Sequence, residues 1–214
     1  LNEVLFCQPD EPLLELTVTL DTDQLFWFNF SGSSWIRRVP ELPPWPPELE
    51  PPELVRRDAT FCQDLLFSLT DIASGQLAQA RGIPVAKVFP SQPVALDKPN
   101  TLVCLVENIF PPAVDITWRE DDVPVTHGVT HTHYTPTGDV SFARFSYLRV
   151  TPSAGTTYSC VVTSRGLNSS TVAYWVAQET GDTETLWTAL CGAAMALGIV
   201  LALMGITMMV AAWR

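Results

Sequence analysis

The cysteines are the residues whose spacing points first to a definite chemistry. Cys7, Cys62, Cys104 and Cys160 are widely separated, and Cys191 lies in a long apolar run near the C-terminus. Reduced cytosolic proteins seldom hold long-range disulfides, so residues 1 to about 186 are expected in a secretory or endosomal lumen. Four cysteines allow three connectivities. Cys191 is expected to be a packed thiol within the apolar run.

No set of residues suits covalent catalysis. The three histidines, His127, His131 and His133, lie in one short stretch, and no serine or free luminal cysteine is placed to work with them. His131 and His133 would share a strand face, but no carboxylate or cysteine follows at metal-ligand spacing. The sequence therefore predicts no enzyme, no metal and no cofactor. An exposed strand without a role and a pH-sensing strand both remain open for these histidines.

Two sequons are candidates for N-glycosylation in a luminal chain. Asn29-Phe30-Ser31 ends an apolar segment, and Asn168-Ser169-Ser170 follows Gly166 in an expected loop. We expect glycans on Asn29 and Asn168.

The C-terminal apolar run predicts a membrane anchor. Leu186 to Trp213 contains no charged residue, and as a helix it would measure about 40 Å, more than the ~30 Å hydrocarbon core of a bilayer. Arg214 follows the run and acidic residues precede it, so the C-terminus is expected in the cytosol and the rest in the lumen. The formal net charge of −11 argues against nucleic acid as a partner.

Short alternating segments between residues 85 and 180 predict a β-sandwich. Turn residues separate the segments, and Trp118 lies fourteen residues after Cys104. Tyr158 stands two residues before Cys160, as in an immunoglobulin tyrosine corner. This context favours the pairing of Cys104 with Cys160. The expected strands are residues 85–89, 101–110, 114–120, 140–150, 157–164 and 172–177.

This half resembles the C1-type immunoglobulin domains of histocompatibility antigens and antibody constant regions. Asn108 to Pro112 is similar to the Phe-Pro-Pro turn of that family. Tyr158 to Ser164 is similar to its Tyr-x-Cys-x-Val-x-His motif, with Ser164 in place of the histidine.

The N-terminal half predicts an incomplete α+β layer. Three alternating segments, residues 14–20, 25–30 and 34–39, precede a proline-rich joint and a helical segment from Pro52. Apolar residues recur at helical spacing on that segment. One helix on a few strands leaves an apolar face and a sheet edge uncovered, so a partner chain is expected. The apolar helix positions are Phe61, Leu65, Leu66, Leu69 and Ile72.

The segments from Asp21 to Phe28 and from Arg38 to Leu42 resemble the alpha-1 domain of class II histocompatibility alpha chains. This resemblance covers essentially the whole chain. It implies an alpha-1-like half-platform over residues 1–84, a C1-like sandwich over 85–178, a connecting peptide over 179–185 and a transmembrane helix over 186–213.

Within that family the chain is most similar to the non-presenting DM-type members. They carry a disulfide between strand and helix in the first domain, which corresponds here to Cys7 with Cys62. The phrases from Lys98 to Cys104 and from Ala173 to Val176 are also similar to theirs.

The DM-type resemblance implies a function without covalent chemistry. The chain would pair with a DM-like beta chain in late endosomal or lysosomal membranes and speed peptide exchange, including removal of the CLIP peptide, on peptide-loaded class II molecules. A DO-like modulator is a further implied partner. Arg81 and Asn108 match contact positions for the loading partner, whereas Gln178 replaces an arginine there.

The helical segment also lacks the residues that hold a peptide. Presenting alpha chains use asparagine carboxamides to pair with both the N–H and the C=O of an extended peptide. No asparagine occurs between Glu53 and Lys87. The run from Pro43 to Leu54 is expected to be a rigid entrance to the helix. The alternative function is that of a peptide-presenting class II alpha chain.

Overall fold

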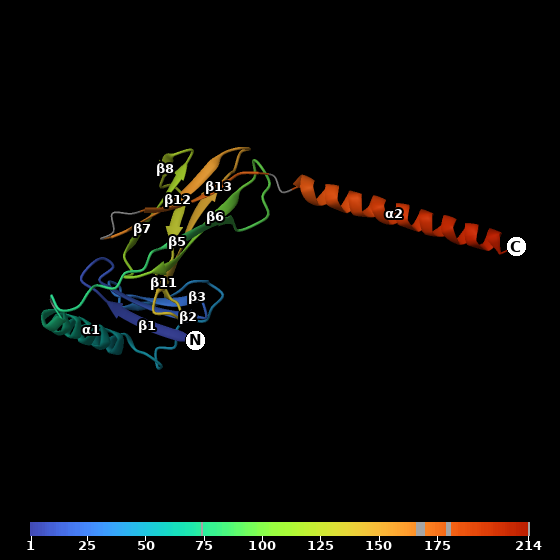
Figure 1. Ribbon diagram of the computed structural model, residues 1–214. Coiled ribbons are helices and arrows are strands. Elements are labelled where there is room, and N and C mark those ends of the chain that lie inside the picture. The colour runs from blue at the N-terminus through green and yellow to red at the C-terminus, as the bar shows by residue number, and fades with distance from the viewer. Residues whose placement is uncertain (74, 166–169, 179–180, 214) are drawn as a thin grey trace.

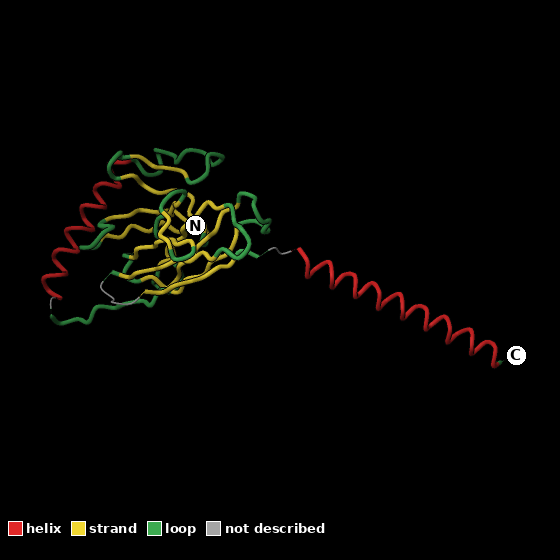
Figure 2. Tube along the Cα trace, turned by 90° about the horizontal axis from the view of Figure 1, so that it is seen from above, coloured by secondary structure: helices red, strands yellow, loops and turns green. Residues whose placement is uncertain are grey.

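The computed structural model describes residues 1–73, 75–165, 170–178 and 181–213. A four-stranded sheet lies between one helix, α1, and a sandwich of two further sheets (Figure 1). A second helix, α2, extends away from the other elements in both views (Figures 1 and 2). The expected class is confirmed: an α+β half-platform, an immunoglobulin C1-type sandwich and an apolar helix that could span a membrane.

The N-terminal sheet has one strand more than the three predicted. Its antiparallel order is β1-β2-β3-β4, and the additional strand β1 lies at one edge. Alternation along these strands separates two faces. Leu16 and Phe28 pack toward the helix, whereas Phe6 packs against the sandwich core. The strands are β1 (Asn2–Cys7), β2 (Leu14–Leu20), β3 (Asp23–Asn29) and β4 (Ser34–Arg37).

Helix α1 (Pro52–Ala73) begins with proline, whose missing N–H is no loss in the first turn, and carries Glu53 there. After Ala73 the described chain turns at Gly75, which has a φ of 74°. Only Val55 and Ala59 are fully buried in α1, and Val55 packs with Leu16 and Phe28. The helix is therefore held to its sheet along a narrow face.

A disulfide also ties α1 to the sheet, about two turns farther along the helix than Val55. Cys7 at the end of β1 is bonded to Cys62 in α1, with the two Cα atoms 6.1 Å apart. The bond closes the segment from Cys7 to Cys62, which includes β2, β3, β4 and the proline-rich run.

The sandwich consists of two antiparallel sheets, in the orders β10-β11-β6-β5 and β13-β12-β7-β8, with β9 also paired to β11. The six predicted strands are present, and β8, β9 and β10 are short additions. The strands are β5 (Val85–Pro90), β6 (Asn100–Ile109), β7 (Val114–Glu120), β8 (Val123–Val125), β9 (Val129–His131), β10 (Thr135–Pro136), β11 (Phe142–Val150), β12 (Thr157–Ser164) and β13 (Ser170–Val176).

The sandwich core has the arrangement that its cysteine spacing predicted. Cys104 and Cys160 form a fully buried disulfide beside Trp118, whose indole N–H donates to Ser146 Oγ at 2.8 Å. The Tyr158 hydroxyl differs from a tyrosine corner because it donates to Glu120 Oε1 at 3.0 Å. Burial and this carboxylate raise the pKa of Tyr158.

The segment that joins α1 to β5 passes closely along the end of β6. The Gly82 N–H donates to the Phe110 carbonyl at 2.8 Å, and the Asn108 side chain donates to the Ile83 carbonyl at 3.0 Å. A Cβ atom on Gly82 would lie 2.3 Å from the Asn108 carbonyl oxygen. Only glycine allows this approach of the two backbones.

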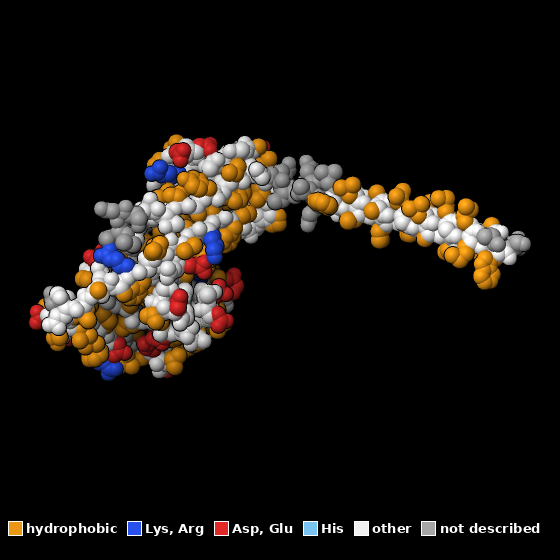
Figure 3. Space-filling view, in the orientation of Figure 1, with side chains coloured by type: hydrophobic (Ala, Val, Ile, Leu, Met, Phe, Trp, Pro, Cys, Tyr) orange, Lys and Arg blue, Asp and Glu red, His pale blue; other side chains and the backbone are white. Residues whose placement is uncertain are grey.

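Helix α2 (Gly181–Ala212) is apolar along the stretch Trp187–Ala211, which is long enough to cross a bilayer. Hydrophobic side chains cover the helix in the space-filling view (Figure 3). None of the described residues in this stretch packs against the remainder of the chain.

Replacing both Cys7 and Cys62 with serine should destabilise the N-terminal domain by about 4 kcal/mol, because the unfolded chain would lose a crosslink closing about 55 residues. Hydrogen exchange on the assembled ectodomain should show faster exchange in α1 and unchanged protection in β6 and β12. Equal protection of α1 in the variant and the wild type would contradict this role of the bond.

Gly82→Ala should destabilise the folded chain by about 1–3 kcal/mol, since the new methyl group overlaps the Asn108 carbonyl. Gly138→Ala is the matched control, because a Cβ atom there meets nothing within 4 Å. Thermal unfolding should separate the two variants. Equal melting temperatures would show that the segment around Gly82 can move away at no cost.

Candidate functional site

The outward face of α1 carries an apolar stripe formed by five side chains. Phe61 and Ile72 are about 70% exposed, and the other three are between 38% and 53% exposed. Such a contiguous exposed surface marks an interaction site in a folded protein. We name this surface the α1 stripe: Leu54, Phe61, Leu65, Leu69 and Ile72. Leu66, predicted to share this face, is instead half-buried.

The α1 stripe offers little to an extended peptide backbone. Gln63 is the one carboxamide residue in α1, and at 100° per residue it projects from the side opposite Leu54 and Ile72. A peptide lying along the stripe would meet apolar carbon rather than amide groups. The surface suits another apolar surface better than it suits a bound peptide.

The sheet edge next to the helix is also uncovered. Within the described chain β1 pairs only with β2, and its other edge carries unpaired backbone N–H and C=O groups. Such an edge accepts a further strand. The free edge and the α1 stripe thus lie in the same half of the domain, because α1 packs beside β1.

The two domains meet around one tyrosine. The Tyr134 N–H donates to Glu15 Oε2 at 3.1 Å, and its carbonyl accepts from Thr17 Oγ1 at 3.3 Å. Its hydroxyl accepts from the Val114 N–H at 2.9 Å. The Arg144 guanidinium lies over the ring, 4.7 Å from its centroid. Tyr134 therefore connects β2 of the first domain to β7 and β11 of the sandwich.

Two half-buried titratable groups lie at this junction, and their pKa values are shifted in opposite directions. Burial raises the pKa of Glu15 to about 7, against the Tyr134 N–H and Arg144, which lower it. His133 stacks on Trp27, with the ring centroids 4.9 Å apart, and shares a hydrogen bond with Gln24. Burial, with the charge of Arg144, lowers the pKa of His133 to about 4.

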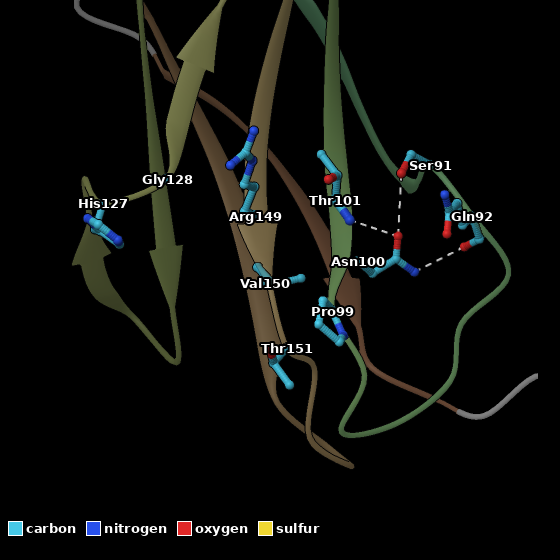
Figure 4. A pocket seen from close by; sticks show the side chains of 10 residues that line it. All are labelled: Ser91, Gln92, Pro99, Asn100, Thr101, His127, Gly128, Arg149, Val150 and Thr151. Atoms are coloured by element: carbon cyan, nitrogen blue, oxygen red, sulfur yellow. Dashed lines mark hydrogen bonds between the residues drawn. The ribbon is translucent and has the colours of Figure 1, made fainter.

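The three histidines occupy different environments. His131 lies at the end of β9, where partial burial and the charge of Arg144 lower its pKa. His127 lies at a surface pocket of the sandwich, apart from the junction (Figure 4). In that pocket the Asn100 amide is already bonded to the Gln92 carbonyl and the Thr101 N–H. Among the described residues no cluster of His, Cys, Asp or Glu has the arrangement of a metal site.

The predicted contact residues lie where the first domain joins the sandwich. The Asn108 side chain is committed to the Ile83 carbonyl, and Asn108 adopts a φ of 57°. Arg81 donates to Gln79 Oε1 at 2.8 Å. Gln178 is exposed after β13. The structure thus gives Asn108 a structural task, and contact roles for Arg81 and Asn108 remain predictions.

Of the two sequon asparagines, the structure describes Asn29 but not Asn168. Asn29 Oδ1 accepts from the Ser31 and Gly32 N–H groups at 3.1 and 3.2 Å, which fixes the β3–β4 turn. Glycosylation at the Asn29 amide nitrogen remains a prediction. Asn168 lies outside the described residues, and its glycan also remains a prediction.

Sequence reasoning did not single out Glu15, Tyr134 or Arg144. Glu15 is 119 positions from Tyr134, and Tyr134 is 20 positions from Val114. The alternation in residues 14–20 was the one available signal, because it places Glu15, Thr17 and Thr19 on the same face of β2.

Comparison with known proteins agrees with the geometry. Residues 86–167 match the immunoglobulin C1-set domain family. The chain is 34% identical to the DM alpha chain of human class II histocompatibility antigens over 96% of its length and 78% of the relative. It is 35% identical to the mouse class II histocompatibility antigen M alpha chain, over 100% and 81%. It is also 33% identical to the human DQ alpha 2 chain, over 95% and 77%.

These identities extend over both domains and the apolar helix, well beyond the immunoglobulin domain alone. The chain therefore belongs to the family of class II histocompatibility antigen alpha chains.

Proposed function

We propose that this chain is the alpha subunit of a DM-type heterodimer that accelerates peptide release and exchange on class II molecules. The observation that carries the proposal is the α1 stripe, which is apolar where a peptide-presenting helix needs carboxamides. The similarity to DM and M alpha chains and the Cys7–Cys62 bond support the same assignment.

The second subunit is a DM-like beta chain. It would add a strand at the free edge of β1 and cover the α1 stripe with its own helix. Both surfaces lie on the same half of the domain, so one partner could cover both. The cleft between the two helices would then be lined by apolar side chains and be narrow or closed.

The clients are peptide-loaded class II molecules, and a DO-like modulator is a further partner. The heterodimer would bind a partly emptied client conformation better than the filled one. A thousandfold faster release requires about 4 kcal/mol of preferential binding to that conformation. The contact surface includes the region of Arg81, and the setting is the late endosomal or lysosomal membrane.

The domain junction supports work at acidic pH. From pH 7.5 to 5, Glu15 takes up a proton in the folded state because its pKa is raised, and this stabilises the fold by about 2 kcal/mol. His133 stays neutral when folded but is protonated when unfolded, which destabilises the fold by about 2 kcal/mol over the same range. The two contributions to the stability of the fold are opposite in sign and similar in size. The junction would therefore be about as stable at pH 5 as at pH 7.5.

The purified heterodimer should accelerate loss of a fluorescent peptide from a class II molecule at pH 5. Arg81→Ala should reduce the acceleration several-fold, and Lys98→Ala, an exposed cation elsewhere, should leave it unchanged. Fluorescence polarisation measures the release rate. An unchanged release rate with the wild-type heterodimer would reject the function, and peptides eluting from the heterodimer itself would favour a presenting chain.

Substitutions of Glu15 and of His133 should change the pH dependence of stability in opposite directions. Glu15→Gln removes the stabilisation that appears below pH 7, so its melting temperature should fall relative to wild type on acidification to pH 5. His133→Gln removes the acid-dependent cost, so its relative melting temperature should rise. Parallel pH profiles for wild type and both variants would show that neither group titrates as described.

A further inference from the structure

The proline-rich run folds back over the N-terminal sheet, where the sequence analysis expected only a stiff entrance to α1. Trp45 of the run stacks on Trp35 of β4, with the ring centroids 4.6 Å apart, and meets Phe26 of β3 edge-on at 5.2 Å. The Trp35 Nε1–H donates to the Glu50 carbonyl at 3.3 Å. Glu50 is therefore held against the sheet, two residues before α1 begins.

The side chain of Glu50 meets another carboxyl group. It is hydrogen-bonded to the side chain of Glu3 on β1. The Oε2 atom of Glu50 is buried and receives no hydrogen bond from an N–H or hydroxyl group in the described part of the chain. Ionised carboxylates only accept hydrogen bonds, so this bond exists only when one of the two groups carries a proton. We name Glu3 and Glu50 the carboxyl pair.

The carboxyl pair joins β1 to the start of α1. Alternation along β1 places Glu3 on the same face as Leu5, which packs on the apolar cluster beneath α1, and Cys7. Cys7 is bonded to Cys62, and α1 lies beside β1 (Figure 1). One end of β1 is thus tied to the helix by a covalent bond. The other end is tied to the run that leads into the helix by a bond that depends on a proton.

The surroundings of the carboxyl pair are acidic. Burial, the charge of Glu3 together with its hydrogen bond, and the charge of Asp58 on α1 raise the pKa of Glu50 to about 7. The cations of β4 and α1 in this region have other acceptors: Arg37 donates to the Leu42 carbonyl, Arg56 to the Phe30 carbonyl and Arg57 to Asp58 Oδ1. A proton is therefore the means by which the repulsion within the pair is relieved.

The proline-rich run is not fully satisfied in this position. Trp45 Nε1 is buried and has no acceptor in the described part of the chain. A hollow of about 640 Å³ is lined by residues of both the run and β4, among them Pro47 and Arg37. A buried donor without a partner costs free energy that contact with water would recover. The bond within the carboxyl pair offsets this cost only while the proton is present.

We propose that the carboxyl pair is a pH-sensitive contact that holds the proline-rich run against β1 at acidic pH and releases it near neutral pH. When the proton passes to solvent, two adjacent carboxylates repel each other and the run moves away from the sheet, which exposes Trp45 Nε1 to water. The run leads directly into Leu54, the first residue of the α1 stripe. Acidity would therefore fix the surface that the second subunit covers, a step that rests on the proposed function.

The direction of the pH dependence follows from the raised pKa of Glu50. The closed state binds the proton more tightly than an open state in which the carboxyl group has its ordinary pKa of 4.5. Closing is therefore favoured on acidification, and the preference is lost as the pH rises through about 7. The ratio of open to closed molecules should fall at least about tenfold from pH 8 to pH 5.

The test uses the full-length heterodimer in nanodiscs, with 5-fluorotryptophan in this chain, and follows it by ¹⁹F NMR between pH 8 and pH 5. The Trp45 signal is assigned by its loss in Trp45→Phe. In the wild type this signal should move between two positions with a midpoint near pH 7, because the ring leaves its contacts when the run opens. The signal of Trp187 in α2 should not move.

Glu50→Gln and Glu3→Gln each supply an amide N–H that bonds to the remaining carboxylate without a proton. In both variants the Trp45 signal should stay at its pH 5 position over the whole range. Glu48→Gln, at an exposed position of the same run, should titrate as the wild type does. A wild-type Trp45 signal that does not change with pH would overturn the proposal. So would a titration that persists in both pair variants, because another group, such as Glu15, would then move the run.

The peptide-release assay on the same samples separates this proposal from the proposed function. A titrating Trp45 signal without accelerated release would overturn the exchange function and leave the carboxyl pair as described. Accelerated release with a Trp45 signal that does not titrate would overturn the pH-sensitive contact alone.

Discussion

Incomplete burial of α1 is the constraint on which the N-terminal domain depends. A single helix on four strands can bury one narrow face, and here that face is centred on Val55 and Ala59. The α1 stripe remains in water, and the disulfide from Cys7 to Cys62 supplies part of the attachment that a wider contact would provide. The N-terminal domain is therefore one half of a larger α+β layer. The incomplete burial of α1 both limits the stability of this domain and leaves exposed the surface that a partner would cover.

The immunoglobulin domain, by contrast, covers its own core. Its two sheets cover each other, and its core contains a buried disulfide, Trp118 and a paired indole N–H. Such a core needs no partner. Phe6 of β1 packs against this core, so the sandwich supports the N-terminal sheet.

The contact between the domains is polar as well as apolar, which gives it a dependence on pH. Tyr134 uses its backbone toward β2 and its hydroxyl toward β7, so it is a fixed point for both domains. Glu15 and His133 flank it with pKa values displaced in opposite directions by the same burial. The spacing of the histidines suggested that they could sense acidity. Burial instead makes His133 resistant to protonation and raises the pKa of the Glu15 carboxyl group to about 7.

The elements whose signal is local could be predicted from the order of the amino acids. Cysteine and tryptophan spacing predicted the sandwich, alternation predicted three of the four N-terminal strands, and an uncharged apolar run predicted the C-terminal helix. Helical periodicity also identified four members of the α1 stripe. The residues of β1 show no clear alternation, so that strand was not predicted. Helical periodicity also did not indicate which side of α1 packs on the sheet.

Contacts between residues that are distant along the chain could not be predicted in this way. Glu15 reaches Tyr134 across 119 positions, and Trp45 stacks on Trp35 because the proline-rich run folds back over the sheet edge. These contacts depend on how layers pack, and packing depends on the summed shape of many side chains rather than on any local pattern. The pKa values of Glu15 and His133 follow from that packing, so they could not be predicted from the sequence alone.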